Sequence, residues 1–175
     1  GMASHYAALQ GRFMLALDIQ HVRMKQHATD KAQALQCLVD ILVEDQLVTP
    51  DYIYGLTARE QQSATYLGQG IAIPHGTPQS RQCILKTGIR LAHFPEGVVW
   101  DGENKIYLAV VIAAKSDEHL QVLQILTRAL IHDVSEQVKH ATSAEQIIEL
   151  LQAQPPSLSL HENLIATQVA AHDVE

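Results

Sequence analysis

Hydrophobic positions recur at two different periods along this chain, and stretches of one period alternate with stretches of the other. Between Thr29 and Gln46 the apolar residues follow the spacing of an amphipathic helix, with Thr29 as its expected cap. The apolar positions of this stretch are Ala34, Leu35, Leu38, Ile41 and Leu42. A second helix is predicted to start at Pro50 and to run through Tyr54 to Glu60, because proline is tolerated in a first helical turn.

Short apolar runs without the helical period predict β-strands. They are Phe13 to Ile19, Ile71 to Ile73, Lys86 to Ala92 and Ile106 to Ala113. The last run is almost entirely apolar, as expected of a strand that is covered on both faces, so it should be central in its sheet. Because strands alternate with helices, the predicted class is α/β, with a mixed parallel and antiparallel sheet of about five strands sandwiched between helices.

The C-terminal part of the chain is predicted to be helical. The stretch from Asp117 to Ile131 carries a stripe of leucines on one face. These leucines are Leu120, Leu123, Leu126 and Leu130. Two shorter helices, at about Val134 to His140 and Ser143 to Leu151, are expected to close the domain.

These elements place one domain over residues 13–151. Residues 1–12, in which Gly1 precedes Met2, lack periodicity and are interpreted as an N-terminal extension added for expression. Residues 152–175 contain Pro155 and Pro156 and show no core stripe. We interpret them as a tail or as a linker toward a further domain.

Composition agrees with one compact domain, since 47% of the 175 residues are hydrophobic and 18% are charged. A net charge of −7 and a pI near 5.8 argue against nucleic acid or an anionic membrane as the main partner, because both need a basic face. Apolar runs such as Ile106 to Ala114 are too short to cross a bilayer. Cys37 and Cys83 are expected to be free thiols, and with no secretory signal in view a cytoplasmic location is indicated.

The segment from Gly68 to Thr77 presents one histidine, His75, between Pro74 and Gly76. The apolar run before it predicts that His75 lies at a strand end, where small neighbours let another molecule approach. A neutral imidazole nitrogen attacks phosphorus to form a phosphohistidine, which then transfers its phosphoryl group onward. For a lone Pro-His-Gly tripeptide, however, a turn histidine without a function is the commoner explanation.

Further motifs occur in order around this turn. They are Arg59-Glu60, Tyr66-Leu67-Gly68, Lys86-Thr87-Gly88, Phe94-Pro95-Glu96-Gly97-Val98 and Asp117-Glu118-His119. Together with the His75 turn they resemble the mannitol/fructose class of enzyme IIA (EIIA) domains of the bacterial phosphoenolpyruvate-dependent sugar phosphotransferase system (PTS), from about Phe13 to Leu151. The likeness is greatest to the fructose-type members, in which this domain precedes a phosphocarrier domain on the same polypeptide.

The resemblance implies that His75 is the phosphorylated nucleophile of a phosphotransferase. An HPr-type phosphocarrier, separate or fused, is the implied donor, and a cysteine of a fructose-type enzyme IIB beside a membrane permease is the implied acceptor. His119 is implied to hydrogen-bond His75 or the phosphoryl group, and Arg59 to stabilise phosphoryl charge. No metal ion or other cofactor is implied, and the sugar stays open because an enzyme IIA does not touch it.

The residues themselves leave alternatives for the supporting groups. His119 begins a predicted helix, where N–H donors and the dipole favour a phosphoryl group, although a histidine in a first turn is more often a solvated surface residue. The guanidinium of Arg59 suits phosphoryl oxygens, yet arginine near a helix carboxyl end also complements the dipole. Thr77 either donates its hydroxyl or caps the segment from Pro78 to Arg81. Gly76 is expected to supply freedom of turn.

Two other functions agree with parts of the sequence. One is a regulatory binding module of the same fold, in which phosphorylation of His75 switches the affinity for a partner. The other is a histidine-based metallohydrolase, suggested by the ten histidines, which are scattered without ligand spacing. Among them, His93 is placed in a loop at a strand end that can approach the site.

Overall fold

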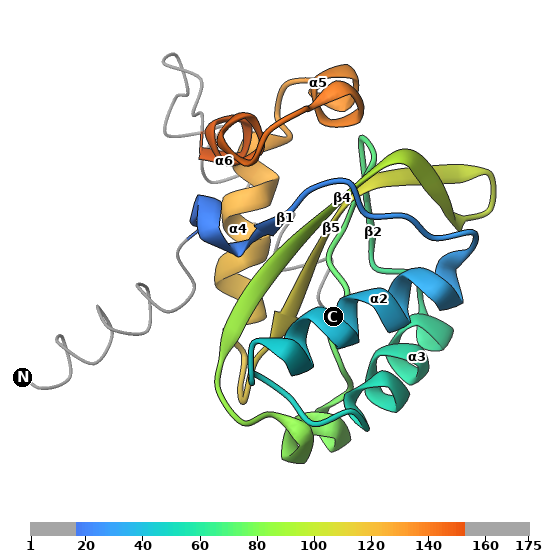
Figure 1. Ribbon diagram of the computed structural model, residues 1–175, viewed down its shortest axis with the longest axis vertical. Helices are drawn as coiled ribbons and strands as arrows, with labels where there is room; N and C mark the ends of the chain where they lie inside the picture. Colours follow the sequence, from blue (N-terminus) through green and yellow to red (C-terminus); the bar gives the residue numbers. More distant parts are fainter. Residues whose placement is uncertain (1–16, 153–175) are drawn as a thin grey trace, which may run out of the picture.

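A five-stranded mixed sheet organises the protein (Figure 1). In the computed structural model, which describes residues 17–152, the strands lie in the order β1-β4-β5-β3-β2. They are β1 (Val22–Arg23), β2 (Tyr66–Gly68), β3 (Ile71–Ala72), β4 (Gly88–Asp101) and β5 (Asn104–Ala113). The pairs β4–β5 and β2–β3 are antiparallel, whereas β1–β4 and β3–β5 are parallel. The predicted mixed sheet and its central strand are therefore confirmed.

Helices cover both faces of this sheet (Figure 1). They are α2 (Lys31–Glu44), α3 (Tyr52–Gln62), α4 (His119–Ala129), α5 (Ser135–His140) and α6 (Ala144–Gln152), with the 3-10 helices η1 (Ile19–His21) and η2 (Pro78–Cys83). The helices α2 and α3 lie on one side of the sheet, and α4 and α6 lie on the other. This arrangement is the predicted sandwich.

Strand β5 connects the two hydrophobic cores, because successive side chains of a strand point to opposite faces. Leu108, Val110 and Ile112 belong to the core beneath α4 and α6. Ala109 and Val111 belong to the core beneath α2 and α3. All of them are completely buried, as the apolar run predicts for a strand covered on both faces.

Helix α2 begins one residue later than predicted, because Asp30 caps it in place of Thr29. The Asp30 Oδ1 accepts the N–H of Gln33 at 2.8 Å. Thr29 lies just before the cap, and its N–H and hydroxyl donate to Gln33 Oε1 at 2.9 and 3.1 Å. The carboxylate of Asp30 thus accepts a free N–H at the start of the helix, which is the capping role predicted for Thr29. The apolar face itself is confirmed, since every predicted position on it is buried.

Two other helices differ from the prediction in detail. Pro50 lies in a turn before α3, in which the N–H of Tyr52 donates to the carbonyl of Thr49 at 3.1 Å. Helix α4 is shorter at both ends than the predicted helix. Its buried residues are Val122, Leu123, Leu126 and Ala129. Leu123 and Leu126 of the predicted leucine row are therefore confirmed as core residues, whereas Val122 and Ala129 are buried in place of Leu120 and Leu130.

The predicted strand from Phe13 to Ile19 is wrong where it can be compared. Residues 13–16 lie outside the described part of the chain, the next two have no regular structure, and η1 follows. The Asp18 carboxylate accepts the N–H of Gln20 at 3.1 Å, which favours a local turn over an extended strand. The first strand is β1, and it pairs with β4.

Strands β2 and β4 go beyond the sequence prediction. The short strand β2 was not predicted, and it pairs with β3 across a turn in which Gln69 has φ 53° and Gly70 has φ 79°. Strand β4 runs on past Ala92. His93 thus lies within β4, completely buried, with its Nε2 donating to the carbonyl of Val138 at 2.7 Å. The predicted loop position of His93 is wrong.

Helix α6 takes in the first residue of the predicted linker, and residues 153–175 lie outside the described part of the chain. The assignment of a domain to residues 13–151, with an extension before it and a linker after it, stays a prediction. None of the helices between residues 17 and 152 combines the length and apolarity that a bilayer crossing needs.

We expect Leu108→Ala to lower the free energy of unfolding by about 2–5 kcal/mol, because it opens a cavity in a covered strand. Leu85, whose surface is 55% exposed, provides a control of the same residue type. Leu85→Ala should change the free energy of unfolding by less than about 0.5 kcal/mol. Urea unfolding followed by circular dichroism measures both values, and equal losses would contradict the central place of β5.

Candidate functional site

Three distant parts of the chain meet beside the end of β3. His75 follows β3, Arg59 lies in the last turn of α3, and His119 is the first residue of α4. The rings of His75 and His119 are stacked, with centroids 4.9 Å apart and an angle of 17° between their planes. The fold therefore brings the two predicted histidines into contact.

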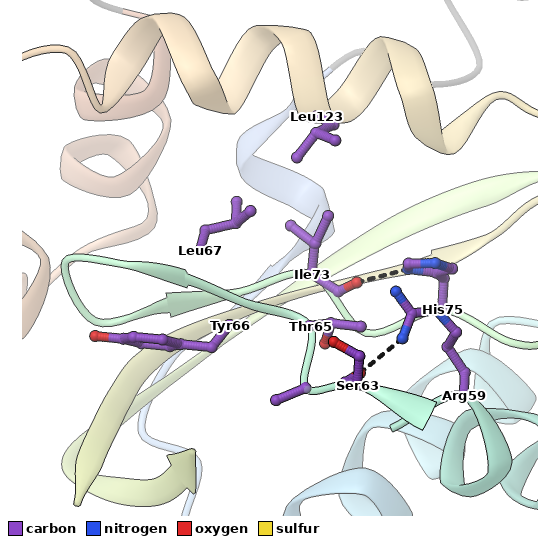
Figure 2. Close-up of a pocket in the computed structure, with 9 residues that line it drawn as sticks. Arg59, Ser63, Thr65, Tyr66, Leu67, Ile73, His75 and Leu123 are labelled. Carbon is purple, nitrogen blue, oxygen red and sulfur yellow. Dashed lines mark hydrogen bonds between the residues drawn. The ribbon is translucent and has the colours of Figure 1, made fainter. Parts of the chain in front are cut away.

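Arg59 and His75 line one pocket, whose other walls come from the segment around β2 and from α4. The lining residues are Arg59, Ser63, Ala64, Thr65, Tyr66, Leu67, Ile73, His75 and Leu123. Figure 2 shows Leu123 reaching the pocket from α4, while Arg59 and His75 lie together at one end of it. A cation and an imidazole thus share an opening to solvent.

Main-chain contacts fix the orientation of the His75 ring. Its Nδ1 lies 2.9 Å from the carbonyl oxygen of Ile73, so Nδ1 must be the protonated nitrogen that donates (Figure 2). The carbonyl of Pro74 accepts the N–H of Ile112 at 2.9 Å, and His75 forms a parallel bridge with the same residue of β5. The ring therefore presents Nε2, without a proton in the neutral form, as the available nucleophilic atom.

The environment of His75 keeps its ring neutral. Burial lowers the pKa of His75 to about 4, and the neighbouring His119 and Arg59 act in the same direction. The hydrogen bond to Ile73 and the carboxylate of Glu60 oppose this shift of the pKa. At neutral pH the side chain is thus a neutral base.

His119 is also biased toward its neutral form, since burial and the nearby Arg81 lower its pKa against the opposing effect of Asp117. Arg81 forms an ion pair with Asp117 at 3.2 Å, which joins η2 to the loop before α4. The sequence reasoning missed Arg81, because its proximity to His119 depends on the fold alone. Each histidine of the stacked pair therefore has an arginine near it.

Arg59 lies near the carboxyl end of α3, where it complements the helix dipole, and it also lies at the site. Its Nη1 donates to the carbonyl of Ser63 at 2.7 Å, just beyond the carboxyl end of α3. A guanidinium carries five N–H donors, so this single bond leaves others for a ligand in the pocket.

Tyr52, which was not among the predicted site residues, connects the His75 turn to β5 through its hydroxyl. Its hydroxyl donates to the carbonyl of Ile112 at 2.8 Å and accepts the N–H of Gly76 at 2.9 Å. Burial raises the pKa of Tyr52 to about 12, so the hydroxyl stays protonated. In the sequence Tyr52 is one more apolar position of an amphipathic helix, and nothing marks its hydroxyl as a partner of the turn.

Close packing, and not backbone freedom, explains the glycine after His75. Gly76 does not have a positive φ. A Cβ on Gly76 would lie 2.2 Å from Ser80 Oγ and 2.6 Å from a ring carbon of Tyr52. A Cβ on Gly55 of α3 would lie 2.2 Å from Ser80 Cβ. The expected role of Gly76 in turning the chain is therefore wrong, and its task is to let η2 and α3 approach the turn.

Thr77 occupies the cap position of η2, but its side chain makes no capping hydrogen bond. The residue is buried, and its carbonyl accepts the N–H and the hydroxyl of Ser80 at 3.0 and 2.7 Å. The capping role that was weighed for the Thr77 side chain is thus wrong. A hydroxyl contact from Thr77 to a ligand stays a prediction.

Metal chemistry has no matching site in the part of the chain that the structure describes. Between residues 17 and 152, no three histidine, cysteine or acidic side chains are grouped so that they could hold a metal ion. Cys37 and Cys83 are free thiols, and Cys37 donates to Gln26 Oε1 at 3.4 Å.

Comparison with known proteins matches residues 16–154 to the family described as "Phosphoenolpyruvate-dependent sugar phosphotransferase system, EIIA 2". A multiphosphoryl transfer protein of Escherichia coli O157:H7 is 42% identical over 164 residues, which are 92% of this chain and 44% of that protein. The chain thus spans less than half the length of this relative.

Solved structures agree with these matches. The crystal structure of mannitol IIA from Escherichia coli is 36% identical, with a TM-score of 0.71 over 78% of this chain and 99% of that chain. A structure of the complex of enzyme IIA and phosphorylated enzyme IIB for mannitol, also from Escherichia coli, has the same TM-score of 0.71, at 35% identity over 78% of this chain and 97% of that chain. The resemblance drawn from the motifs is confirmed.

We expect Tyr52→Phe to lower the free energy of unfolding by about 1–3 kcal/mol, because it strips the Gly76 N–H and the Ile112 carbonyl of a buried partner. Tyr54→Phe is a matched control in the same helix, since Tyr54 is 73% exposed. Urea unfolding measures both variants. A loss for Tyr52→Phe no larger than that for Tyr54→Phe would contradict this role of the hydroxyl.

We expect the ring of His75 to stay neutral until the pH falls to about 4, as followed by NMR of its ring nitrogens. The folded state then binds fewer protons than the unfolded chain, whose histidines titrate near 6.5. The stability that depends on neutral His75 is therefore complete above about pH 6.5 and declines as the pH falls from 6.5 toward 4.

The His75→Asn variant is the comparison for this pH dependence. It should lose less stability than the natural sequence between pH 7 and pH 5, with a residual decline from His93 and His119, whose pKa values are also lowered. Parallel pH profiles of the two proteins in urea unfolding would show that His75 is not held neutral by the fold.

Proposed function

We propose a phosphoryl-carrier function for this chain, which belongs to the EIIA 2 family of the phosphoenolpyruvate-dependent sugar phosphotransferase system. In this proposal His75 accepts a phosphoryl group from an HPr-type phosphocarrier and passes it to an enzyme IIB. The observation that carries the proposal is the fixed tautomer of His75, with Nδ1 bonded to a main-chain carbonyl and the ring kept neutral by burial.

The transfer step follows from that tautomer. The lone pair of His75 Nε2 attacks the phosphorus of a phosphohistidine on the donor, while the N–P bond of the donor breaks and its electron pair returns to the donor imidazole. The His75 ring gains positive charge as the new N–P bond forms. Because Nδ1 keeps its proton, the carbonyl of Ile73 stabilises this charge through a charge-assisted hydrogen bond.

Positive and donor groups around the ring suit the oxygens of the transferred group. Arg59 lines the same pocket as His75, and His119 is stacked against it. We assign Arg59 to the phosphoryl charge and a ring nitrogen of His119 to a hydrogen bond with a phosphoryl oxygen. No metal ion is needed in this scheme, because in-line placement and cationic side chains stabilise the transition state.

The proposed partners are drawn from the relatives. The mannitol enzyme IIA of Escherichia coli, which is similar to this chain, has been solved together with phosphorylated enzyme IIB. The similarity to a multiphosphoryl transfer protein supports a fructose-type system, with a cysteine of fructose-type enzyme IIB as acceptor and a separate or fused HPr-like domain as donor. The reaction is assigned to the cytoplasmic side of a sugar permease.

Labelling with radioactive phosphoenolpyruvate, enzyme I and HPr tests this function. We expect one acid-labile phosphoryl group per chain, complete loss of label in His75→Ala, and transfer of the label to fructose-type enzyme IIB. Arg59→Lys should slow labelling on the order of tenfold, because a lysine does not reproduce the planar, paired hydrogen bonds of a guanidinium.

His132→Ala, which removes an exposed histidine, is the control and should be labelled like the natural sequence. Full labelling of His75→Ala would refute the assignment of the nucleophile. Stable label on the natural chain, without transfer to any enzyme IIB, would instead favour a regulatory module.

A further inference from the structure

Glu60, the neighbour of Arg59, is a buried carboxylate to which the reaction scheme gives no task. Its side chain is 4% exposed, and its Oε2 lies 2.7 Å from Lys31 Nζ. The same carboxylate accepts the N–H of Thr65 at 3.1 Å and also the hydroxyl of Thr65. A buried carboxylate is tolerated when it is paired and hydrogen-bonded in this way.

Lys31 is itself held in place by its surroundings. It is the first residue of α2, and its ammonium lies 5.0 Å from the centre of the Trp100 ring of β4. The pair of Lys31 and Glu60 thus connects α2, α3 and the chain that enters β2.

From Glu60 a continuous series of hydrogen bonds leads to the reacting ring. The carbonyl of Thr65, whose N–H is held by Glu60, accepts the N–H of Ile73 at 3.0 Å. The carbonyl of Ile73 in turn accepts Nδ1–H of His75 at 2.9 Å. Between the carboxylate and the imidazole the series passes through main-chain groups, which have little freedom to rearrange.

We propose that Glu60 is a positioning residue for phosphoryl transfer, which sets the Ile73 carbonyl under Nδ1 of His75 by anchoring Thr65. It touches neither the nucleophile nor the phosphoryl group. The kinetic part of this inference rests on the proposed function, whereas the part that concerns the His75 tautomer does not.

The alternative is that the ion pair serves stability alone. Replacing a buried ion pair with apolar residues of similar size is often neutral or stabilising, so stability gives no strong reason for a charge here. A negative charge close to the site also opposes the approach of a phosphoryl dianion, and the adjacent Lys31 offsets that cost. The carboxylate is explained by its two hydrogen bonds to Thr65, which an apolar side chain does not provide.

The test compares Glu60→Met, which keeps the volume but removes the acceptor, with Glu60→Gln, which keeps an acceptor oxygen. Glu44→Met at the exposed end of α2 is the control for the substitution itself. The first measurement is the tautomer of His75 from NMR of its ring nitrogens at pH 7. The second is the rate of phosphoryl transfer from saturating phospho-HPr. This rate is expressed per folded molecule, with the folded fraction measured by circular dichroism.

For folded Glu60→Met we expect a mixture of His75 tautomers. We also expect the transfer rate to fall by about 10- to 100-fold, because small displacements of a reacting group slow a reaction by this order. Glu60→Gln should keep the Nδ1–H tautomer and stay within about threefold of the natural rate. Glu44→Met should match the natural sequence in both measurements. If Glu60→Met does not fold, Thr65→Val, which removes one of the two hydrogen bonds, should show the same two effects in weaker form.

A single Nδ1–H tautomer and an unchanged rate in folded Glu60→Met would overturn the inference, and so would the same result for Thr65→Val. If the natural chain takes up no label at all, the proposed function fails. The tautomer of the folded variants then still decides whether Glu60 orients His75.

Discussion

The hydrogen bond from His75 Nδ1 to the carbonyl of Ile73 is the contact on which the chemistry of this site depends. In net terms such a bond contributes only about 1 kcal/mol to stability. Its importance lies in choosing between two nitrogens, because a proton held at Nδ1 leaves the lone pair at Nε2. Two main-chain hydrogen bonds hold the Ile73 carbonyl in place. The N–H of Ile73 donates to the carbonyl of Thr65, and the carbonyl of Pro74 accepts the N–H of Ile112 in the central strand. In the proposed transfer, a weak interaction at the end of the inner strand β3 thus decides which atom reacts.

The same surroundings keep the two imidazoles of the site neutral, although a cationic arginine lies beside them. Two stacked imidazoles with centroids 4.9 Å apart are poor places for two positive charges, and burial lowers the pKa of both. Both nearby arginines already make a contact within the protein. Arg59 donates to the carbonyl of Ser63, and Arg81 forms an ion pair with the carboxylate of Asp117. In our proposal a phosphoryl dianion on Nε2 reverses this preference for neutral rings, because positive neighbours then stabilise the anion. His75 is thus a neutral base before the proposed transfer, and the groups around it form an anion site after it.

Much of this arrangement follows from the sequence, and what does not follow has a common physical cause. The apolar face of α2 and the covered strand β5 are given by periodicity, and the His75 turn by three adjacent residues. By contrast, the choice of Asp30 as cap depends on a one-residue difference in backbone geometry between two good capping residues. The role of Tyr52 depends on a contact with Gly76, twenty-four positions later. Hydrogen bonds between residues far apart in the chain produce no periodic pattern in the sequence. Most of the hydrogen bonds that orient the site are of this long-range type.

Close packing around the His75 turn bears on how the proposed transfer is aligned. Gly76 and Gly55 lie against Ser80 so closely that a methyl group on either would overlap it, and the Tyr52 hydroxyl accepts the N–H of Gly76. This packing restricts the backbone beside His75, and the hydrogen bond from Nδ1 to the Ile73 carbonyl orients the ring while no partner is bound. In-line transfer requires the attacking nitrogen, the phosphorus and the leaving nitrogen to align within a few tenths of an ångström. With one end of that line fixed by the fold, alignment has to come from the way the partner docks. Because the His75 turn is rigid, the in-line geometry of the transfer depends on how well the shape of the partner fits this site.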